Sequence, residues 1–276
     1  MSSCIATMIK NEHEYLDEWI KYHLSLGVSH IFIFEDLDSD SHKEITDKYE
    51  NVSLANISTI LSFKDLEVVK KLKVTKEYNP QRIYFKRAVR YIKNNFDYKW
   101  CFCIDVDEFI TLEGNKDLDS TINQYSAYDA LLIQWKCYGA NGLIDKPDYS
   151  RKGVVDTYIR PMRGFIPSRR PDSRSKKIMY NLETFDESFC NDVHQPTDLC
   201  NFCNVEFKRD RKSRIFKTIY IRHYITKSWE EYVWKQTIRG YFMGCERSFD
   251  TFFEINPELK YLKDELIAKI NVCEQE

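Results

Sequence analysis

Three carboxylates close an apolar run in the stretch CFCIDVDEFI. Asp105, Asp107 and Glu108 lie within four positions, directly after hydrophobic residues that suit a buried strand. Alternate residues of a strand share a face, so Asp105 and Asp107 are predicted to project the same way. Two anionic oxygen donors side by side suit Mg2+ or Mn2+, which commonly neutralises charge on a diphosphate. The alternative is a solvated loop start, because D-x-D also occurs in ordinary loops.

A second acidic group follows another apolar run, VSHIFIFED. Asp36, Asp38 and Asp40 come directly after it. Apolar runs and helical patterns alternate over residues 1–110, which predicts an α/β fold with a mainly parallel sheet flanked by helices. Ligands of such sheets bind beyond the carboxyl ends of the strands. Both acidic groups are therefore predicted to lie along one rim.

The elements that must position these acids can be placed along the chain. Strands are predicted at 3–9, 28–36, 52–57 and 98–110, with helices between them, one of which starts at Pro80. Later strands end at the turn GANG and at His223, and an aromatic helix follows. We expect one domain over 1–227, with a nucleotide-binding half at 1–110, an acceptor-side half at 111–227 and a C-terminal helical extension at 228–276.

Composition and charge exclude several classes of protein. The 276 residues carry a net charge of -2, which gives no reason to expect a nucleic-acid binder. No apolar stretch approaches the length of a membrane span, and the N-terminus does not resemble a signal peptide. Nine cysteines, an odd number, favour reduced thiols. We expect a cytoplasmic protein whose basic blocks, 160–177 and 208–217, could touch anionic lipid at the inner membrane face.

Four soft metal ligands also lie close together in the sequence. Cys190, His194, Cys200 and Cys203 fall within fourteen positions and would suit a structural Zn2+. The spacing between the two pairs is shorter than in most zinc fingers. Buried thiols, with His194 facing the acceptor or the diphosphate, are therefore the preferred interpretation.

Several motifs in the right order carry a resemblance to a known family. The runs MIKNEHEYLDEWIKYHLSLGVSHIFIFED, NPQ, DVDEF, WKCYGANG, RSKKI and HYITKSWEEYVWKQTIRG span roughly residues 4–245. The chain resembles bacterial GT-A-type glycosyltransferases of the glycosyltransferase family 2, type 4 group, which is related to the glycosyltransferase 92 family. Tyr138 stands where that group has Phe.

The resemblance implies sugar transfer from a nucleotide-sugar, with UDP-sugar the favoured donor, to a glycan or glycolipid. By analogy the reaction inverts the anomeric configuration and serves bacterial surface polysaccharide or lipooligosaccharide synthesis. It implies a GT-A-like, Rossmann-like fold and a metal held by Asp105, Asp107 and His223. Asp107 would be the direct ligand, and Asp105 would act through water or the ribose. A core histidine bonded to a carbonyl is the alternative for His223.

The resemblance and the predicted strand ends together mark the candidate residues. Each has a structural alternative: a helix start for the residues after the first strand, an Asx turn for the two after the second, and a solvated surface for the basic ones. The nucleotide-sugar candidates are Lys10, Asn11, Glu12, Asp36, Asp38, Gln81, Arg82, Asp105, Lys176 and Lys227. The acceptor-side candidates are Trp135, Tyr138, Asn141, Gly142 and His194.

An inverting enzyme needs a carboxylate to take the proton of the acceptor hydroxyl. Asp145, Glu183 and Asp192 are the candidates, and the motifs do not choose between them. Two rival functions use the same features. A sugar-phosphate nucleotidyltransferase would carry a Gly-rich loop after its first strand, where this chain reads MIKNEHEY. A non-enzymatic carbohydrate- or lipid-binding module would bind its ligand without metal.

Overall fold

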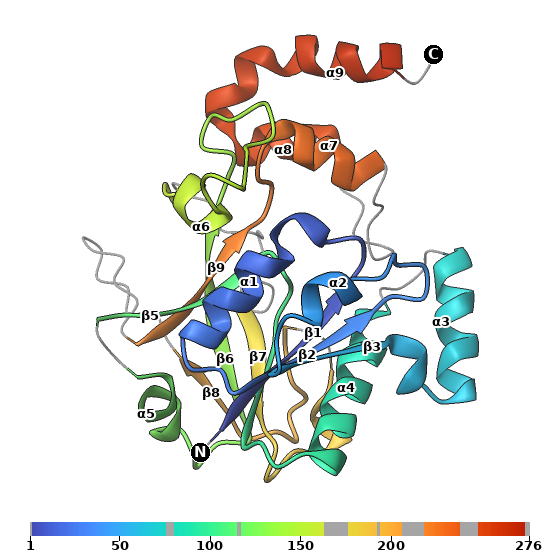
Figure 1. Cartoon of the computed structure of the whole chain (residues 1–276), viewed down its shortest axis with the longest axis vertical. Helices are drawn as coiled ribbons and strands as arrows, with labels where there is room; N and C mark the ends of the chain where they lie inside the picture. The colour runs from blue at the N-terminus through green and yellow to red at the C-terminus, as the bar shows by residue number, and fades with distance from the viewer. Residues whose placement is uncertain are drawn as a thin grey trace.

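A computed structural model describes residues 2–75, 80–114, 117–162, 176–191, 194–205, 218–237 and 248–273. Strands and helices alternate along the first part of the chain, as the sequence predicts (Figure 1). These elements are β1 (Ser3–Ile9), α1 (His13–Ser25), β2 (His30–Glu35), α2 (Lys43–Thr46), β3 (Val52–Asn56), the 3-10 turn η1 (Ile57–Thr59), α3 (Phe63–Thr75), α4 (Gln81–Asn95) and β4 (Trp100–Cys103).

The first four strands form a parallel sheet in the order β3-β2-β1-β4. Both of its faces are covered, which explains why the strands read as continuous apolar runs. On one face Ile5 and Ile9 of β1 pack in the same core as Trp19 of α1. On the other face Ala6 and Met8 of β1 share a core with α4. Period-2 alternation of the strands thus feeds two separate cores.

The second part of the chain extends this sheet with mixed pairings. Its elements are β5 (Glu108–Leu112), α5 (Leu118–Asn123), β6 (Ala130–Tyr138), α6 (Val154–Thr157), β7 (Lys176–Asn181), η2 (Glu187–Phe189), β8 (Phe202–Val205) and β9 (Ile219–Tyr224). Beyond β4 the order is β7-β6-β9-β5, and β8 pairs with β6. The pairs β4–β7, β6–β7 and β5–β9 are antiparallel. The fold is therefore mixed α/β, and the expectation of a mainly parallel sheet holds only for its first half.

The predicted strand at 98–110 is two strands joined by a turn. β4 ends at Cys103, and β5 begins at Glu108 and pairs with β9. The backbone N–H of Glu108 donates to the Asp105 carbonyl at 3.0 Å, and the Glu108 side chain accepts from the Asp105 amide at 2.9 Å. The prediction failed because buried carboxylates need hydrogen-bond donors, and this turn supplies them where a continuing strand would not.

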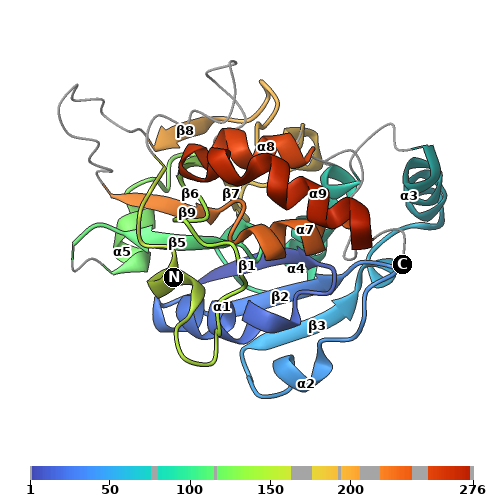
Figure 2. The same cartoon turned by 90° about the horizontal axis from the view of Figure 1, so that it is seen from above.

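Three helices follow β9 and pack on one another through a third core. They are α7 (Trp229–Thr237), α8 (Phe249–Ile255) and α9 (Lys263–Cys273), with η3 (Pro257–Leu262) between the last two. Trp229, Tyr232 and Phe252 lie at the centre of this core. Figure 1 shows the three helices at the top of the molecule, and Figure 2, seen from above, shows them in front of the sheet. Among the described helices none is long and apolar enough to cross a membrane.

Candidate active site

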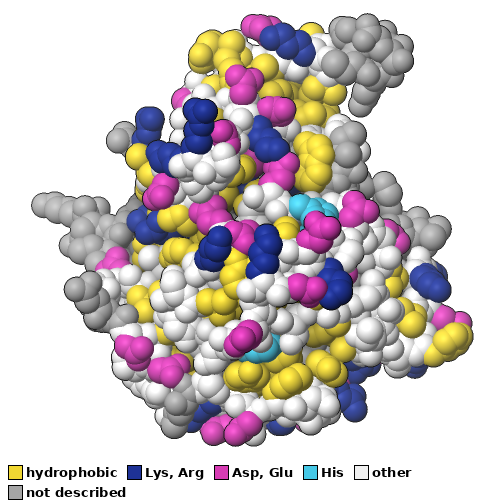
Figure 3. Space-filling model, viewed as in Figure 1, with side chains coloured by type: hydrophobic (Ala, Val, Ile, Leu, Met, Phe, Trp, Pro, Cys, Tyr) yellow, Lys and Arg dark blue, Asp and Glu magenta, His cyan; other side chains and the backbone are white. Residues whose placement is uncertain are grey.

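The two acidic groups follow parallel strands of the same sheet and lie at one edge of it, as predicted. β1 pairs with β2 on one side and with β4 on the other. Asp36 follows β2, and its backbone N–H donates to Ile9 at the end of β1 at 2.9 Å. Asp105 follows β4 at the same edge of the sheet. Acidic and basic side chains intermingle on the face seen in Figure 3, in keeping with the balanced charge of the chain.

Asp105 is held by a lysine of β7, a strand that is remote in sequence but pairs with β4. The Lys177 amine, whose residue is 1% exposed, donates to Asp105 Oδ2 at 2.6 Å and lies 3.5 Å from Glu108 Oε2. Gln81 donates to the other oxygen of Asp105 at 3.3 Å. Burial opposes the charge on Lys177, but Asp105 and Glu108 outweigh it and raise its pKa. Burial in turn raises the pKa of Glu108, although Lys177 opposes that shift.

The sequence motifs select Lys176, the residue next to Lys177, as the nucleotide-binding lysine. Lys176 was the nucleotide candidate, yet its amine bonds Asn204 Oδ1 of β8 at 2.6 Å. Successive residues of a strand project to opposite faces, so one position decides which lysine reaches the acids. Lys177, at the adjacent position of β7, is the one that turns inward.

Asp107 lies in the same turn and meets residues from the C-terminal part of the chain. Its Oδ2 accepts from the Lys235 amine of α7 at 2.9 Å, and its Oδ1 lies 3.8 Å from His223 Nε2 of β9. The backbone carbonyl of Asp107 accepts from Tyr224 at 2.9 Å. Burial opposes ionisation of Asp107, but Lys235, His223 and Lys227 together hold its pKa below the ordinary range.

Lys227 is a buried cation without a hydrogen bond to any other described residue. It is 4% exposed, and its amine lies 3.7 Å from the centre of the Tyr15 ring. Its φ of 55° is the left-handed conformation that non-glycine residues rarely adopt. Burial lowers its pKa, and Asp107 and Glu231 oppose that shift. A desolvated ammonium of this kind is costly unless an anion joins it.

A capping box explains how Lys227 is held. Ser228 caps α7, and Glu231, three residues on, reaches back to the Ser228 amide at 3.2 Å and its hydroxyl at 2.8 Å. The Glu231 carboxylate also accepts from the hydroxyls of Tyr149 at 2.6 Å and Tyr158 at 2.8 Å. The start of α7 is therefore rigid, and it carries Lys227 toward Asp107.

The acceptor-side candidates divide into two groups. Trp135 packs against His223 and His194, with ring centres 4.4 and 5.1 Å apart, so these three lie together. Tyr138 is buried in the core beside Tyr224. Asn141, at φ 54°, bonds both the amide and the carbonyl of Arg160, so its described contacts are those of a structural turn. Gly142 adopts φ 87° in the same turn.

The nucleotide-side candidates surround the two acidic groups. Lys10, Asn11 and Glu12 form the loop after β1, and the Asn11 side chain accepts from the Asp40 amide at 2.8 Å instead of capping α1. Asp36 is buried and accepts from the Tyr84 hydroxyl at 3.0 Å. Two further candidates, Asp38 in the loop after β2 and Arg82 in the first turn of α4, are exposed.

The candidate bases are separated in space. Asp145 is exposed and lies next to Lys146, whose amine bonds Glu14 of α1 and whose backbone N–H bonds Glu230 of α7. Glu183 pairs with Lys99 at 3.1 Å, just before β4 begins and so at the opposite edge of the sheet from Asp105. Asp192 lies outside the described residues.

No three His, Cys, Asp or Glu side chains in the described ranges are grouped as ligands of one metal ion. For the Cys190, His194, Cys200 and Cys203 set, burial raises the pKa of Cys190 to about 11 and that of Cys200 to about 12. Protonated thiols bind zinc poorly. His194 Nδ1 lies 2.8 Å from the Lys176 carbonyl. The free thiols include Cys4, Cys101, Cys103, Cys137, Cys190, Cys200 and Cys203.

Asp107 and His223 together fit a divalent cation. Their facing atoms are 3.8 Å apart, too far for a hydrogen bond. An ion with bonds of about 2.0–2.1 Å, as for Mg2+, can contact both atoms. An oxygen and an imidazole nitrogen also suit Mn2+. Asp105 and Asp107 each pair with a lysine through Oδ2, and Asp107 is the one whose other oxygen faces His223.

Sequence reasoning missed several residues of this site. Lys177 and Lys235 ion-pair with the two aspartates, and Tyr15 underlies Lys227. The helical spacing of α7 could have marked Lys235, because it lies one turn beyond Glu231 and thus on the same face. No local pattern marks Tyr15 or Lys177, since their partners are remote in sequence.

Comparison with known proteins shows the family to which this chain is similar. A model of glycosyltransferase family 92 matches residues 1–268. Glycosyltransferase family 92 proteins of Oryza sativa subsp. japonica and Arabidopsis thaliana are 25% and 26% identical over 192 and 202 residues, which is 67% and 69% of this chain. The same regions are 29% and 30% of those proteins, so the chain spans less than a third of the length of these curated relatives.

Solved structures add little. HddC from Yersinia pseudotuberculosis aligns over 84% of this chain and 97% of its own, at 9% identity and a TM-score of 0.40. A likeness at that level carries no functional argument.

Proposed function

This chain belongs to glycosyltransferase family 92, and we propose that it moves a sugar from a nucleotide-sugar, UDP-sugar in the first instance, to a glycan or glycolipid. The acceptor hydroxyl would attack the anomeric carbon while the bond from that carbon to the diphosphate oxygen breaks. Its proton would pass to a carboxylate. The resemblance to bacterial enzymes suggests a surface polysaccharide or lipooligosaccharide as acceptor, and the plant relatives named above do not bear on that choice.

The buried charge around the turn at 104–107 carries this proposal. Lys177, Lys227 and Lys235, all from the described part of the chain, converge on Asp105 and Asp107. Two of these amines already pair with an aspartate, whereas Lys227 has no such partner among described residues. A leaving diphosphate would supply the missing anion. Preorganised positive charge in a dry site stabilises charge that develops in a transition state.

We propose that Asp107 and His223 hold a Mn2+ or Mg2+ ion, with Asp105 set to contact the donor indirectly. When bound, the ion would neutralise charge on the diphosphate. The protein contributes the rest: Lys227 and Lys235 face the leaving group, and Trp135 packs behind His223 and fixes its ring.

Asp145 is the candidate base that we favour. Its loop is tied to the starts of α1 and α7, and these helices supply Tyr15 and Lys235. Glu183 lies at the wrong edge of the sheet for this role. Asp192 stays a prediction from the sequence. An inverting reaction requires the base to lie across the anomeric carbon from the diphosphate.

The test is a panel of nucleotide-sugars scored for hydrolysis and transfer with Mn2+, with Mg2+ and with EDTA. The variants are Asp107→Ala and His223→Ala. Asp47→Ala is the matched control, because it removes an exposed carboxylate that also pairs with a lysine. We expect Asp107→Ala to lose turnover and His223→Ala to need more metal. Wild-type turnover by Asp107→Ala would overturn the proposed active site. Full turnover in EDTA would overturn only the proposal that the reaction needs a metal ion.

A further inference from the structure

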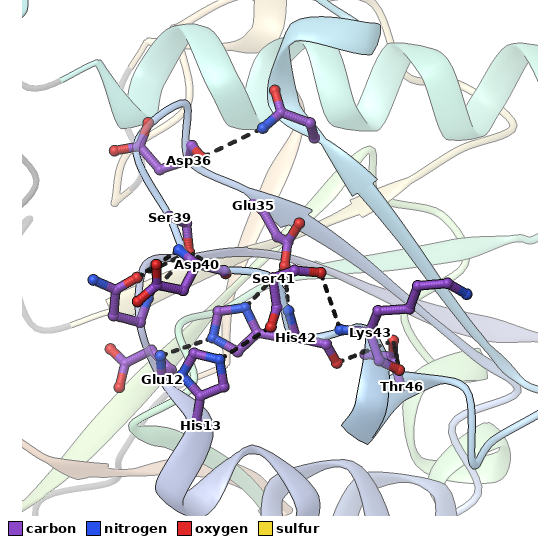
Figure 4. Close-up of polar contacts among 12 residues, drawn as sticks. Glu12, His13, Glu35, Asp36, Ser39, Asp40, Ser41, His42, Lys43 and Thr46 are labelled. Atoms are coloured by element: carbon purple, nitrogen blue, oxygen red, sulfur yellow. Dashed lines mark hydrogen bonds and ion pairs between the residues drawn. The ribbon is translucent and has the colours of Figure 1, made fainter.

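One buried histidine takes part in neither the acidic turn nor the lysines around it. His42 precedes α2, in the loop that follows β2, and its side chain is fully buried at 0% exposed. Figure 4 shows it between the start of α1 and the end of β2. None of the sequence motifs includes it.

The partners of His42 determine its protonation. The backbone N–H of Glu12 donates to His42 Nε2 at 2.9 Å, so Nε2 must carry a lone pair. The neutral ring therefore carries its proton on Nδ1, which donates to Glu35 Oε1 at 2.9 Å. The same Glu35 oxygen accepts from the His42 amide at 2.6 Å. His13 stacks on the ring, with centres 4.0 Å apart.

These contacts join the two loops at the carboxyl ends of β1 and β2. Glu12 is the last residue before α1, and Glu35 is the last residue of β2. Asn11 adds a second link, because its side-chain oxygen accepts from the Asp40 amide at 2.8 Å and the Ser39 hydroxyl at 3.3 Å. His13 Nε2 lies 3.1 Å from the Ser41 carbonyl. The loops at 10–12 and 36–42 thus form one unit (Figure 4).

We propose that His42 is a positioning residue for donor binding: by accepting the Glu12 N–H, it fixes the loop after β1 against the loop after β2. The inference rests on the proposed function and on the sequence-based expectation that Lys10, Asn11 and Asp36 in these loops contact the nucleotide. Without the imidazole the buried Glu12 N–H would lack its acceptor, which costs about 1–3 kcal/mol. Asn11, held at φ 52°, would relax and the loops would separate before nucleotide binds.

The contact between His42 and Glu12 exists only while the His42 ring is neutral. The groups that face His42 are Glu35 from β2 and Glu12 and His13 from the start of α1. Burial lowers the pKa of His42 below 6.5, although Glu35 opposes this. A proton on Nε2 would place N–H against N–H and break the link to Glu12. Donor affinity should therefore hold at neutral pH and fall as the pH drops through this lowered pKa.

Two substitutions separate the contacts of the ring. His42→Gln can place an amide oxygen near Nε2 and keep an acceptor for Glu12. His42→Asn keeps a donor near Nδ1 but loses that acceptor. The matched control is His30→Asn, which removes a partly buried histidine at the amino end of β2 that bonds Ser53 at 2.8 Å. The readouts are calorimetric affinity for UDP and GDP between pH 5 and 8, and amide hydrogen exchange at residues 10–13 without nucleotide.

We expect His42→Asn to bind nucleotide about tenfold more weakly at pH 7.5, which corresponds to about 1.4 kcal/mol. Its affinity should change less between pH 5 and 7 than that of wild type, and its amides at 10–13 should exchange faster. Its kcat at saturating donor should stay near wild type. His42→Gln should bind within about threefold of wild type, and His30→Asn should match wild type in affinity and pH profile.

Failure of this role can be told from failure of the proposed function. If wild type binds nucleotide and His42→Asn binds it equally well at every pH, the role of His42 is wrong. A wild-type protein that binds neither nucleotide overturns the proposed function and the donor role with it. Even then, faster amide hydrogen exchange at residues 10–13 in His42→Asn, but not in His30→Asn, would show that His42 holds the loop after β1. If His42→Asn does not fold, an unaltered pH profile in His42→Gln overturns the proposal.

Discussion

The carboxyl edge of the sheet carries two acidic groups that are held in different ways. After β2, Asp36 accepts from the Tyr84 hydroxyl and the Leu37 amide, at 3.0 and 2.9 Å. After β4, Asp105 and Asp107 pair with the amines of Lys177 and Lys235. Tyr84 and Leu37 hydrogen-bond the first carboxylate through uncharged groups, whereas lysines compensate the charge of the other two within a buried cluster. We interpret the first as a surface for a neutral base or ribose and the second as a place where charge changes.

The largest effect should come from Asp107. Asp107→Asn removes one negative charge beside the amines of Lys235 and Lys227, and the Asp107 side chain is only 12% exposed. Breaking a buried ion pair costs roughly 3–5 kcal/mol, so stability should fall as well as turnover. Because burial is outweighed and the pKa is lowered from 3.8, its stabilisation is present above that pH and lost as the pH falls.

Urea unfolding at pH 7 and pH 3, with turnover at pH 7, checks this. Unchanged stability of Asp107→Asn at pH 7 would place the carboxylate outside the charge cluster. The acidic groups after β2 and β4 would then not differ in how they are held.

Lys227 and Lys177 should respond in opposite ways to replacement by methionine. Lys227→Met removes a buried ammonium that has no hydrogen bond to a described residue, so stability should rise by about 1 kcal/mol. Its kcat/KM should fall on the order of a hundredfold, because charge opposite the diphosphate is lost. Lys177→Met leaves Asp105 and Glu108 facing each other, so stability should fall by roughly 3–5 kcal/mol.

Denaturant titration of both variants, with kcat/KM for the donor, measures the contrast. A Lys227→Met protein that is less stable than wild type would mean that this lysine serves the fold instead of an anion.

A smaller effect is expected from Asp36, in the acidic group after β2. Asp36→Asn keeps an acceptor for Tyr84 but loses the charge, so the KM for the donor should rise about tenfold, as for one charge-assisted hydrogen bond. The kcat should stay within about twofold, because this acidic group lies away from the reacting bond. Steady-state kinetics against donor concentration decides it. A fall in kcat with unchanged KM would assign Asp36 to the chemical step. The acidic groups after β2 and β4 would then share one role.

The smallest effect should come from Lys176, which also serves as the control for Lys177. Its amine bonds Asn204 at the edge strand β8. Lys176→Met should change stability by less than about 0.5 kcal/mol and leave turnover intact. The same measurements as for Lys177→Met apply. If Lys176→Met loses donor binding, then the lysine named by the motif is the functional one and the inward role of Lys177 is wrong.

Local patterns were sufficient for the first half of the fold. Apolar runs bounded by Asn, Gly and Pro predicted β1, β2, β3, α1 and α4, because their side-chain periodicity reflects burial on two faces. The same reasoning placed Asp36 and Asp105 at one edge. It failed at residues 104–107, where a turn stabilised by the Glu108 side chain replaces the expected continuation of the strand.

Residue types and motif order thus determined, from the sequence alone, the α/β class and the acidic edge of the sheet, and they marked Asp107, His223 and Lys227 as candidates. Only the tertiary structure decided which groups meet them. Lys177 reaches Asp105 across 72 positions and Lys235 reaches Asp107 across 128. Tyr15 lies beneath Lys227, and His42 meets Glu12. Such pairings depend on strand order and on which face a residue occupies, and a shift of one position in β7 would exchange Lys177 for Lys176.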